Sequence, residues 1–360
     1  MKMLIDPFRD FIEQLDKRLE GNRFYEPWKT ISTFFFSEKT TTSLPGPHIK
    51  DNNNLKRYMS VAMGAVAPTV VASIYLFGWR SLALVIFCYI FGIMIEMGFA
   101  AAKGEEVTEG MFVTCILYPM ILPPTIPFWM AAVGLAVGLI LGKEVFGGTG
   151  KNIFNPAIVG RVFLAVTFPV EMAAQWVTPY EGFPGGFVRW VKELDATSVA
   201  TPLTELKNGT MASVSDMIIG TTGGSLGETS AVLIVIGGTV LLFTRVANWR
   251  LTLSTIVASM ALAAGMHYAN PESFASPLYH LAGGGLLFGA FFMVTDPVSS
   301  PFTSIGKYIY GGMIGFLTIF IRNLSGFPEG MMFAILFMNM FAPVIDDAVL
   351  ALKYRKADDS

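Results

Sequence analysis

The stretch at residues 81–101, SLALVIFCYIFGIMIEMGFAA, carries one charged side chain, that of Glu96. A helix of about 20 apolar residues is long enough to cross the hydrocarbon core of a bilayer. Backbone polar groups inside a membrane must be satisfied by the protein itself, so only helices and closed barrels cross it. The run is long and continuous, and it therefore predicts a membrane-spanning helix.

The composition extends this prediction to the whole chain. Of its 360 residues, 53% are hydrophobic and 14% are charged, and the mean hydropathy is +0.55. Soluble domains carry about 25% charged residues, so this chain has too little charge to cover a water-facing surface. The net charge of −2 and the lack of a basic run argue against nucleic-acid binding. We expect an all-α, polytopic membrane protein.

Ten apolar segments follow one another, and the longest hydrophilic stretch divides them five and five. Several are shorter than the roughly 17–25 residues of a tilted span, so we expect some helices to be broken or half-spanning. An odd number per half predicts an inverted repeat, although no sequence repeat accompanies it. The segments are 58–79, 81–101, 108–122, 126–142, 155–171, 230–244, 251–266, 278–295, 308–321 and 330–350.

The basic residues predict the orientation. Twenty of the 25 Lys and Arg residues fall on the side of the N-terminus and five on the other side. Because such residues collect on the cytoplasmic side, we expect both termini to be cytoplasmic. The chain then divides into an N-terminal extension (1–57), a first transmembrane half (58–171), an outer, periplasmic loop (172–229), a second transmembrane half (230–350) and a cytoplasmic tail (351–360).

The N-terminal extension contains one amphipathic pattern. Its apolar residues recur at helical spacing, with charged residues between them, and are Phe8, Phe11, Ile12, Leu15 and Leu19. This pattern fits a helix on a membrane surface or on a partner protein. A solvated extension docked on its own core fits it equally well.

The stretch KEVFGGTGKNIFNP at 143–156 lies at an inner boundary between two apolar segments. It is not a phosphate-binding P-loop, because Val145 and Asn152 stand where that motif needs glycine and a hydroxyl residue. A glycine-rich turn remains, followed by the amides of Asn152 and Asn155. Amides can pair with a heteroaromatic ring. A re-entrant loop whose asparagines satisfy backbone ends is the simpler interpretation of these residues alone.

Acidic residues at membrane depth are functional hypotheses by default. Glu96 lies in the middle of its segment, and Asp296 follows the aromatic run FGAFF at 288–292. Phe288 and Phe292 are four residues apart, so they share a helix face near that acid. Alternatively, the phenylalanines face lipid and Asp296 caps a turn. Cys88 and Cys115 lie in apolar runs and suit small buried residues, and we predict no metal site.

Four stretches together resemble the NqrB/RnfD family, the membrane subunits of Na⁺-translocating NADH:quinone oxidoreductase and of the related Rnf ferredoxin:NAD oxidoreductase. The resemblance covers nearly the whole chain from about residue 48, and the matches occur in the same order. They are EEVTEGMFVTCILYPMILPPTIPFW (105–129), KEVFGGTGKNIFNPAIVGR (143–161), FGAFFMVTDPVS (288–299) and PEGMMFAILFMNMFAPVID (328–346). The resemblance implies a subunit of a six-subunit, ion-pumping complex in the bacterial inner membrane.

The resemblance also implies a covalent FMN, joined by a phosphoester to the threonine of an Asp-x-x-Ser-Gly-Ala-Thr motif. That pattern falls on Asp195, Ser198, Ala200 and Thr201, with Val199 where glycine is usual. We therefore expect Thr201 to carry FMN, attached by a flavin transferase. A phosphoester needs an alcohol oxygen, and the charge distribution independently predicts that this loop lies outside.

A second, non-covalent flavin, riboflavin, is implied at Asn152 and Asn155, with Gly147, Gly148 and Gly150 allowing close backbone approach. Quinone is expected near the inner ends of the second and third helices, and the ion path near the aromatic run. The matching positions for quinone are Gly92, Glu96, Glu109, Gly110 and Phe112, and those for the ion are Phe288, Phe292 and Asp296.

We therefore expect electrons to pass from a partner's flavin through FMN and riboflavin to quinone, while Na⁺ or H⁺ moves. The protein would place and tune the cofactors, which carry the redox chemistry. An RnfD-type subunit would keep the flavins but exchange electrons with ferredoxin and NAD. Composition and topology alone fit a redox-silent channel or solute carrier of the inverted-repeat kind equally well.

Overall fold

The computed structural model describes Tyr25, Trp28 and the ranges 55–104, 107–174, 176–180, 182–191, 201–207 and 211–358. The described part is helical, and it contains no strand beyond an isolated bridge between Gly78 and Trp190. This agrees with the expected all-α class. The predicted N-terminal amphipathic helix and the motif residues Asp195, Ser198 and Ala200 lie outside the described residues.

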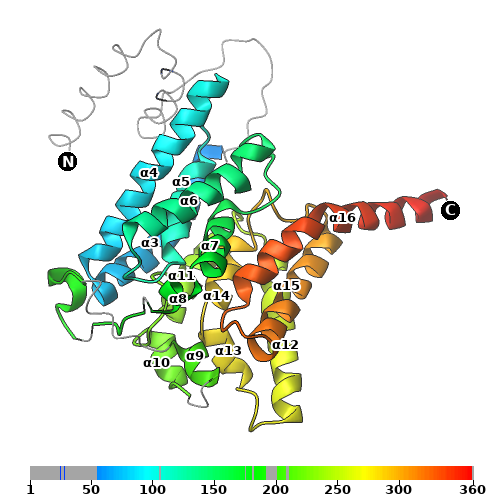
Figure 1. Cartoon of the computed structure of the whole chain (residues 1–360). Coiled ribbons are helices and arrows are strands. Elements are labelled where there is room, and N and C mark those ends of the chain that lie inside the picture. The colour runs from blue at the N-terminus through cyan, green and yellow to red at the C-terminus, as the bar shows by residue number, and fades with distance from the viewer. Residues whose placement is uncertain are drawn as a thin grey trace.

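The helices follow the apolar segments closely, and Figure 1 shows their arrangement. The first half contains α3 (Leu55–Phe77), α4 (Trp79–Lys103), α5 (Gly110–Met120), α6 (Phe128–Gly142), η1 (Glu144–Phe146), α7 (Pro156–Thr167) and α8 (Pro169–Ala174). The connecting region contains η2 (Gly185–Val188), α9 (Pro202–Lys207) and α10 (Val214–Ile219). The second half contains α11 (Ala231–Phe243), α12 (Trp249–Ala269), α13 (Pro277–Ala282), α14 (Leu286–Phe288), the π-helical η4 (Gly289–Met293), α15 (Ser304–Leu324) and α16 (Met331–Asp358).

By length and composition, six helices of the described chain can cross a membrane: α3, α4, α6 with η1, α12, α15 and α16. The expected count of ten spanning helices and the inverted repeat are not supported. Three segments form apolar helices of only 10–17 residues, namely α5, α7 and α11. The segment 278–295 breaks into α13, α14 and η4, because Gly284 adopts a left-handed conformation (φ +66°) between the first two.

Small residues allow the long helices to approach closely. Gly315 of α15 lies against α12, where the Ser259 hydroxyl donates to its carbonyl at 3.2 Å. In the first half, Gly138 of α6 faces Gly160 of α7, and a Cβ at either position would collide with the neighbouring backbone. In lipid, such close packing replaces the hydrophobic effect as the source of helix association.

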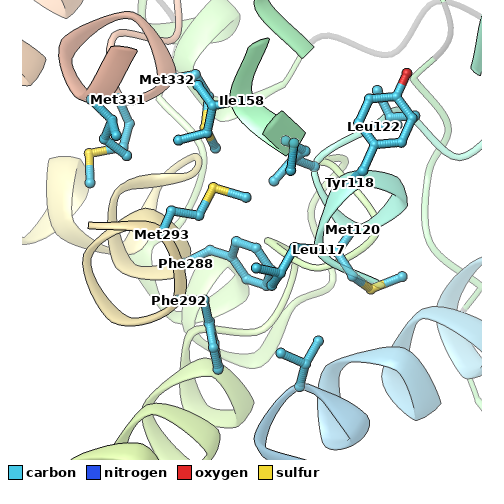
Figure 2. Close-up of a cluster of buried hydrophobic side chains, with 14 of the residues drawn as sticks. Leu117, Tyr118, Met120, Leu122, Ile158, Phe288, Phe292, Met293, Met331 and Met332 are labelled. Carbon is cyan, nitrogen blue, oxygen red and sulfur yellow. The ribbon is translucent and has the colours of Figure 1, made fainter. Parts of the chain in front are cut away.

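The short and broken elements meet at the centre of the molecule. In Figure 1, α7, α8, α11 and α14 lie between the group α3–α6 and the group α12, α15 and α16, while α9, α10 and α13 gather towards one end. Figure 2 shows the core that they share, in which the labelled side chains come from α5, α7, α14, η4 and α16 and from the turn after α5. Two cavities adjoin this core.

Candidate functional site

A cavity of about 630 Å³ lies beside Thr201, and we call it the Thr201 cavity. Helices α7, α8 and α9 form its wall together with the loops before α11, α14 and α16. Ligand clefts enclose roughly 300–1,000 Å³, so this space suits a flavin-sized ligand. The polar and aromatic residues that line it include Arg161, Trp176, Thr201, Glu228 and Glu329.

Thr201 stands directly before α9, with its side chain half-buried at the cavity wall. Its hydroxyl oxygen lies 2.9 Å from that of Thr204, and its carbonyl accepts the backbone N–H groups of Thr204 and Glu205 at 2.8 Å. The Tyr279 hydroxyl donates to the Pro202 carbonyl at 2.7 Å. The hydroxyl needed for a phosphoester is therefore held at the edge of a ligand-sized space.

A buried arginine organises the loops around this cavity. Arg322 of α15 is 3% exposed, and it pairs with Glu329 at 3.1 Å and donates to the His280 carbonyl at 2.6 Å. Glu329 also accepts the backbone N–H groups of Gly285 at 2.8 Å and of Met331 at 2.9 Å. These bonds tie the start of α16 to the glycine run between α13 and α14.

Glu228 and Arg161 face the cavity from separate parts of the chain, one from the loop before α11 and one from α7. Neither forms a salt bridge within the described residues, and Arg161 donates through Nε to the Ile121 carbonyl at 2.8 Å. A Cβ at Gly285 would collide with the Glu228 carboxylate. The glycine is required for the backbone to approach this acid.

The surroundings of the cavity shift the pKa values of its two carboxyl groups in opposite directions. Burial, followed by the charge of Glu329, raises the pKa of Glu228 to about 7. Burial also opposes ionisation of Glu329, but Arg322 and two backbone N–H groups outweigh it and hold the pKa of Glu329 below its ordinary value. Burial and then Arg322 lower the pKa of His280 to about 4, so this histidine is neutral at pH 7. The cavity therefore holds one ionised and one readily protonated carboxyl group.

The predicted riboflavin residues lie elsewhere, in the loop between η1 and α7. Gly147, Gly148 and Gly150 have φ values of +104°, +95° and +90°, which explains the glycines. Asn152 accepts from the Gly150 N–H at 3.2 Å and donates to the Phe154 carbonyl at 2.9 Å. Both hydrogen bonds remain within the loop. Asn152 therefore satisfies backbone groups, as the simpler interpretation of these residues predicted.

Asn155 caps α7 by accepting the Ala157 N–H at 3.0 Å. Asn152 and Asn155 line a second cavity of about 100 Å³, together with Gly110, Phe292 and Asp296. This space is below the roughly 300 Å³ of small ligand clefts, and both amides already serve backbone groups. The described conformation does not fit riboflavin between these asparagines.

The predicted quinone residues come together where α4 meets the start of α5. Glu96 forms a buried ion pair with Lys143, whose side chain is 3% exposed. A Cβ at Gly92 would collide with the Cys115 sulfur, and one at Gly110 would lie 3.0 Å from Thr149. Phe112 is buried and its carbonyl accepts from the Tyr89 hydroxyl at 2.9 Å, while Glu109 directly precedes α5. Cys88 and Cys115 are buried, as expected.

Of the predicted ion-path residues, Phe292 and Asp296 line the cavity of about 100 Å³ beside the two asparagines. The Phe288 and Phe292 rings are 5.0 Å apart and buried in the core, so the alternative that they face lipid is wrong. Asp296 accepts from the Val298 N–H at 3.1 Å and from the Ser299 hydroxyl at 2.9 Å, so it does cap a turn. Burial raises the pKa of Asp296 despite these hydrogen bonds.

Known proteins align with this chain over nearly its whole length. The model of the NQR2, RnfD, RnfE family matches residues 42–355. The chain belongs to this family. It is 36% identical to the B subunit of the Na(+)-translocating NADH-quinone reductase of Ectopseudomonas mendocina, over 97% of this chain and 98% of the relative. The equivalent protein of Yersinia pestis is 33% identical with the same coverage. That of Klebsiella pneumoniae is 41% identical over 77% of this chain and 68% of the relative.

For this member of the NQR2, RnfD, RnfE family, the sequence singled out Thr201 but not Arg161, Arg322 and Glu329 beside it. Arg161 counted only as a basic residue on the inner side, whereas the structure places it within α7 and at the Thr201 cavity. An arginine inside an apolar segment is the same signal that singled out Glu96. Arg322 and Glu329 join only through folding, and no sequence pattern connects them to Thr201.

Proposed function

We propose that this protein is the flavin-carrying membrane subunit of a Na⁺-translocating NADH:quinone oxidoreductase. The main support is a ligand-sized cavity at Thr201 in a chain that is similar to NADH-quinone reductase subunits over 97% of its length. The all-α architecture with six helices of spanning length suits an inner-membrane protein. Both termini are then cytoplasmic, and the other members of a six-subunit complex supply the electron donors.

The Thr201 hydroxyl and the cavity beside it fit a covalently bound FMN. The threonine supplies the alcohol oxygen for a phosphoester, which the flavin transferase would form. The neighbouring cavity offers space for the rest of the cofactor, with apolar walls and a few charged side chains. When bound, FMN would accept and release electrons, while the protein orients it and sets its electrostatic surroundings.

The remaining sites stay predictions of this proposal. Quinone would bind near Glu96, where the buried Lys143 compensates the carboxylate. Asp296 would lie on the route of Na⁺ or H⁺. Riboflavin at Asn152 and Asn155 would require a wider cavity than the one described, and we assign no electron-transfer step to it.

Thr201→Ala tests the proposed function directly. The whole complex is purified after co-expression with the flavin transferase, and the denatured protein is examined for flavin fluorescence in a gel. We expect fluorescence in the wild type and its loss in Thr201→Ala. Thr204→Ala is the matched control. The Thr204 hydroxyl lies 2.9 Å from that of Thr201, but Thr204 is not the threonine of the motif. Covalent flavin in Thr201→Ala would contradict the assignment.

The RnfD alternative differs only in its electron partners. The relatives described above are named as quinone reductase subunits, which favours the NADH and quinone pair and gives the redox-silent carrier no support. Membranes containing the complex separate the two branches. We expect NADH-dependent quinone reduction, whereas ferredoxin-dependent NAD reduction would assign the chain to the Rnf branch.

A further inference from the structure

We propose that the Thr201 cavity seats the isoalloxazine ring of the flavin carried by Thr201, and that Arg161 and Glu228 contact the ring and set its charge. This inference rests on the proposed function and names ring-binding residues outside the attachment motif. It also predicts how the reduction potential of this flavin changes when either of the two charged groups is replaced.

The cavity matches the two halves of an isoalloxazine ring. One half of the ring is an apolar dimethylbenzene, and the other carries carbonyl acceptors and an N–H donor. The cavity has apolar walls from Met172, Trp176 and Met332, and charged side chains from Arg161 and Glu228. A ring bound here has partners for both halves without leaving the buried charges facing an apolar surface.

Arg161 brings a positive charge that the described residues do not neutralise by a salt bridge. Its Nε is already engaged by the Ile121 carbonyl, and that bond anchors the side chain at the cavity wall. In contrast, the neighbouring Arg322 is directly paired with Glu329. A guanidinium in a low-dielectric site stabilises negative charge nearby, so Arg161 favours a ring that has taken up electrons.

Glu228 gives the same cavity a group that exchanges a proton near neutral pH. The charged groups that face it are Glu329, Arg161 and Arg322, and Ser225 hydrogen-bonds to it. When protonated, Glu228 leaves the charge of Arg161 uncompensated, and its carboxyl can donate to a ring acceptor. When ionised, it cancels that charge. Reduction of the bound flavin by electrons from NADH would favour the protonated form of Glu228. The carboxylate would take up one H⁺ from solvent and form one O–H bond, and no other bond of the protein would change.

The experiment uses the whole purified complex with Arg161→Met, Arg161→Lys, Glu228→Gln and, as a control, Lys353→Met, which removes an exposed charge from the C-terminal end of α16. The covalent flavin is quantified by in-gel fluorescence, and its reduction is followed by spectroelectrochemical titration. We expect all four variants to retain the flavin. At a fixed potential, Arg161→Met should lower the ratio of reduced to oxidised flavin about tenfold, Arg161→Lys should change it less, and Lys353→Met should not change it.

The Glu228→Gln variant tests the proton-linked part. The potential of the wild-type flavin should change its pH dependence near pH 7, and Glu228→Gln should remove that change. Retained flavin with unchanged potentials in Arg161→Met and unchanged pH dependence in Glu228→Gln would overturn this inference and leave the proposed function standing. Flavin that persists in Thr201→Ala would instead overturn the proposed function.

A cavity-filling variant decides the matter if Arg161→Met does not assemble. Ala165 lines the cavity from α7, and Ala165→Phe occupies the space without removing a charge. We expect the attached flavin to become accessible to quenching by iodide in Ala165→Phe, and to be shielded in the wild type. Equal quenching in both proteins would show that the ring lies outside the cavity.

Discussion

The Tyr279 hydroxyl donates a 2.7 Å hydrogen bond to the carbonyl of Pro202, the residue directly after Thr201. Tyr279 is 2% exposed and belongs to α13, 77 residues away in the chain. The segment that would accept the flavin is thereby anchored to the second half of the molecule.

Tyr279→Phe should lower the fraction of protein that carries covalent flavin. The change removes the hydrogen bond, which contributes about 0.5–1.5 kcal/mol. A less ordered Thr201 segment is a poorer substrate for attachment. Flavin stoichiometry from in-gel fluorescence measures this, with Tyr268→Phe as a control because Tyr268 is 83% exposed. Full attachment in Tyr279→Phe would show that the anchor is dispensable.

Glu228 should make the stability of the flavin-free protein depend on pH. Its pKa is raised to about 7 by burial and then by the charge of Glu329, so ionisation is opposed in the folded state. The stabilising contribution is present below the pKa of about 4.5 that an unfolded Glu has, and it is lost as the pH rises through about 7. Arg161 and Arg322 also face this group, but they only partly offset the shift.

In the Thr201→Ala background, Glu228→Gln should therefore have the higher melting temperature at pH 8 and lose this advantage at pH 4.5. The flavin-free background ensures that the measurement reports the carboxyl group and not a bound ring. Parallel melting curves for both proteins across this pH range would contradict the raised pKa.

The buried pair of Glu96 and Lys143 should behave very differently from a surface ion pair. Glu96→Gln leaves the Lys143 ammonium buried without its partner, and such a loss costs about 3–5 kcal/mol. The double variant Glu96→Gln with Lys143→Met should recover most of that stability. For comparison, Lys103→Met breaks the pair with Glu144, in which the lysine side chain is 32% exposed and the glutamate side chain 6% exposed. This variant should cost less than Glu96→Gln, because solvent already screens the lysine. Thermal unfolding of the purified complex distinguishes these cases. A double variant no more stable than Glu96→Gln would show that the unpaired Lys143 is not the cause of the destabilisation.

The same pair marks the limit of what the sequence can predict. The run at 81–101 becomes α4 (Trp79–Lys103), because a continuous apolar stretch specifies a helix locally. The partner of Glu96 lies 47 residues away, and only the packing of α4 on α6 brings it close. Local pattern therefore identified a buried acid but not the lysine that allows its burial.

The broken segment 278–295 shows a second limit. Its hydropathy marked one apolar segment, but Gly283, Gly284 and Gly285 open the chain between α13 and α14. A Cβ at Gly284 would collide with the Glu329 carboxylate and one at Gly285 with that of Glu228, and both acids come from other loops. Thr201 was singled out through a motif, whereas the cavity beside it depends on these long-range contacts.

Two glycines on one helix test the close approach of α12 and α15. A Cβ at Gly315 would collide with the Thr255 carbonyl of α12, whereas one at Gly312 meets nothing within 4 Å. Gly315→Ala should therefore destabilise the protein by about 1–3 kcal/mol through overpacking. Gly312→Ala introduces the same group at a free position and should be neutral or slightly stabilising, because alanine favours helix. Chemical or thermal unfolding of the complex compares the two, and equal stability of both variants would mean that α12 and α15 do not pack as closely as described.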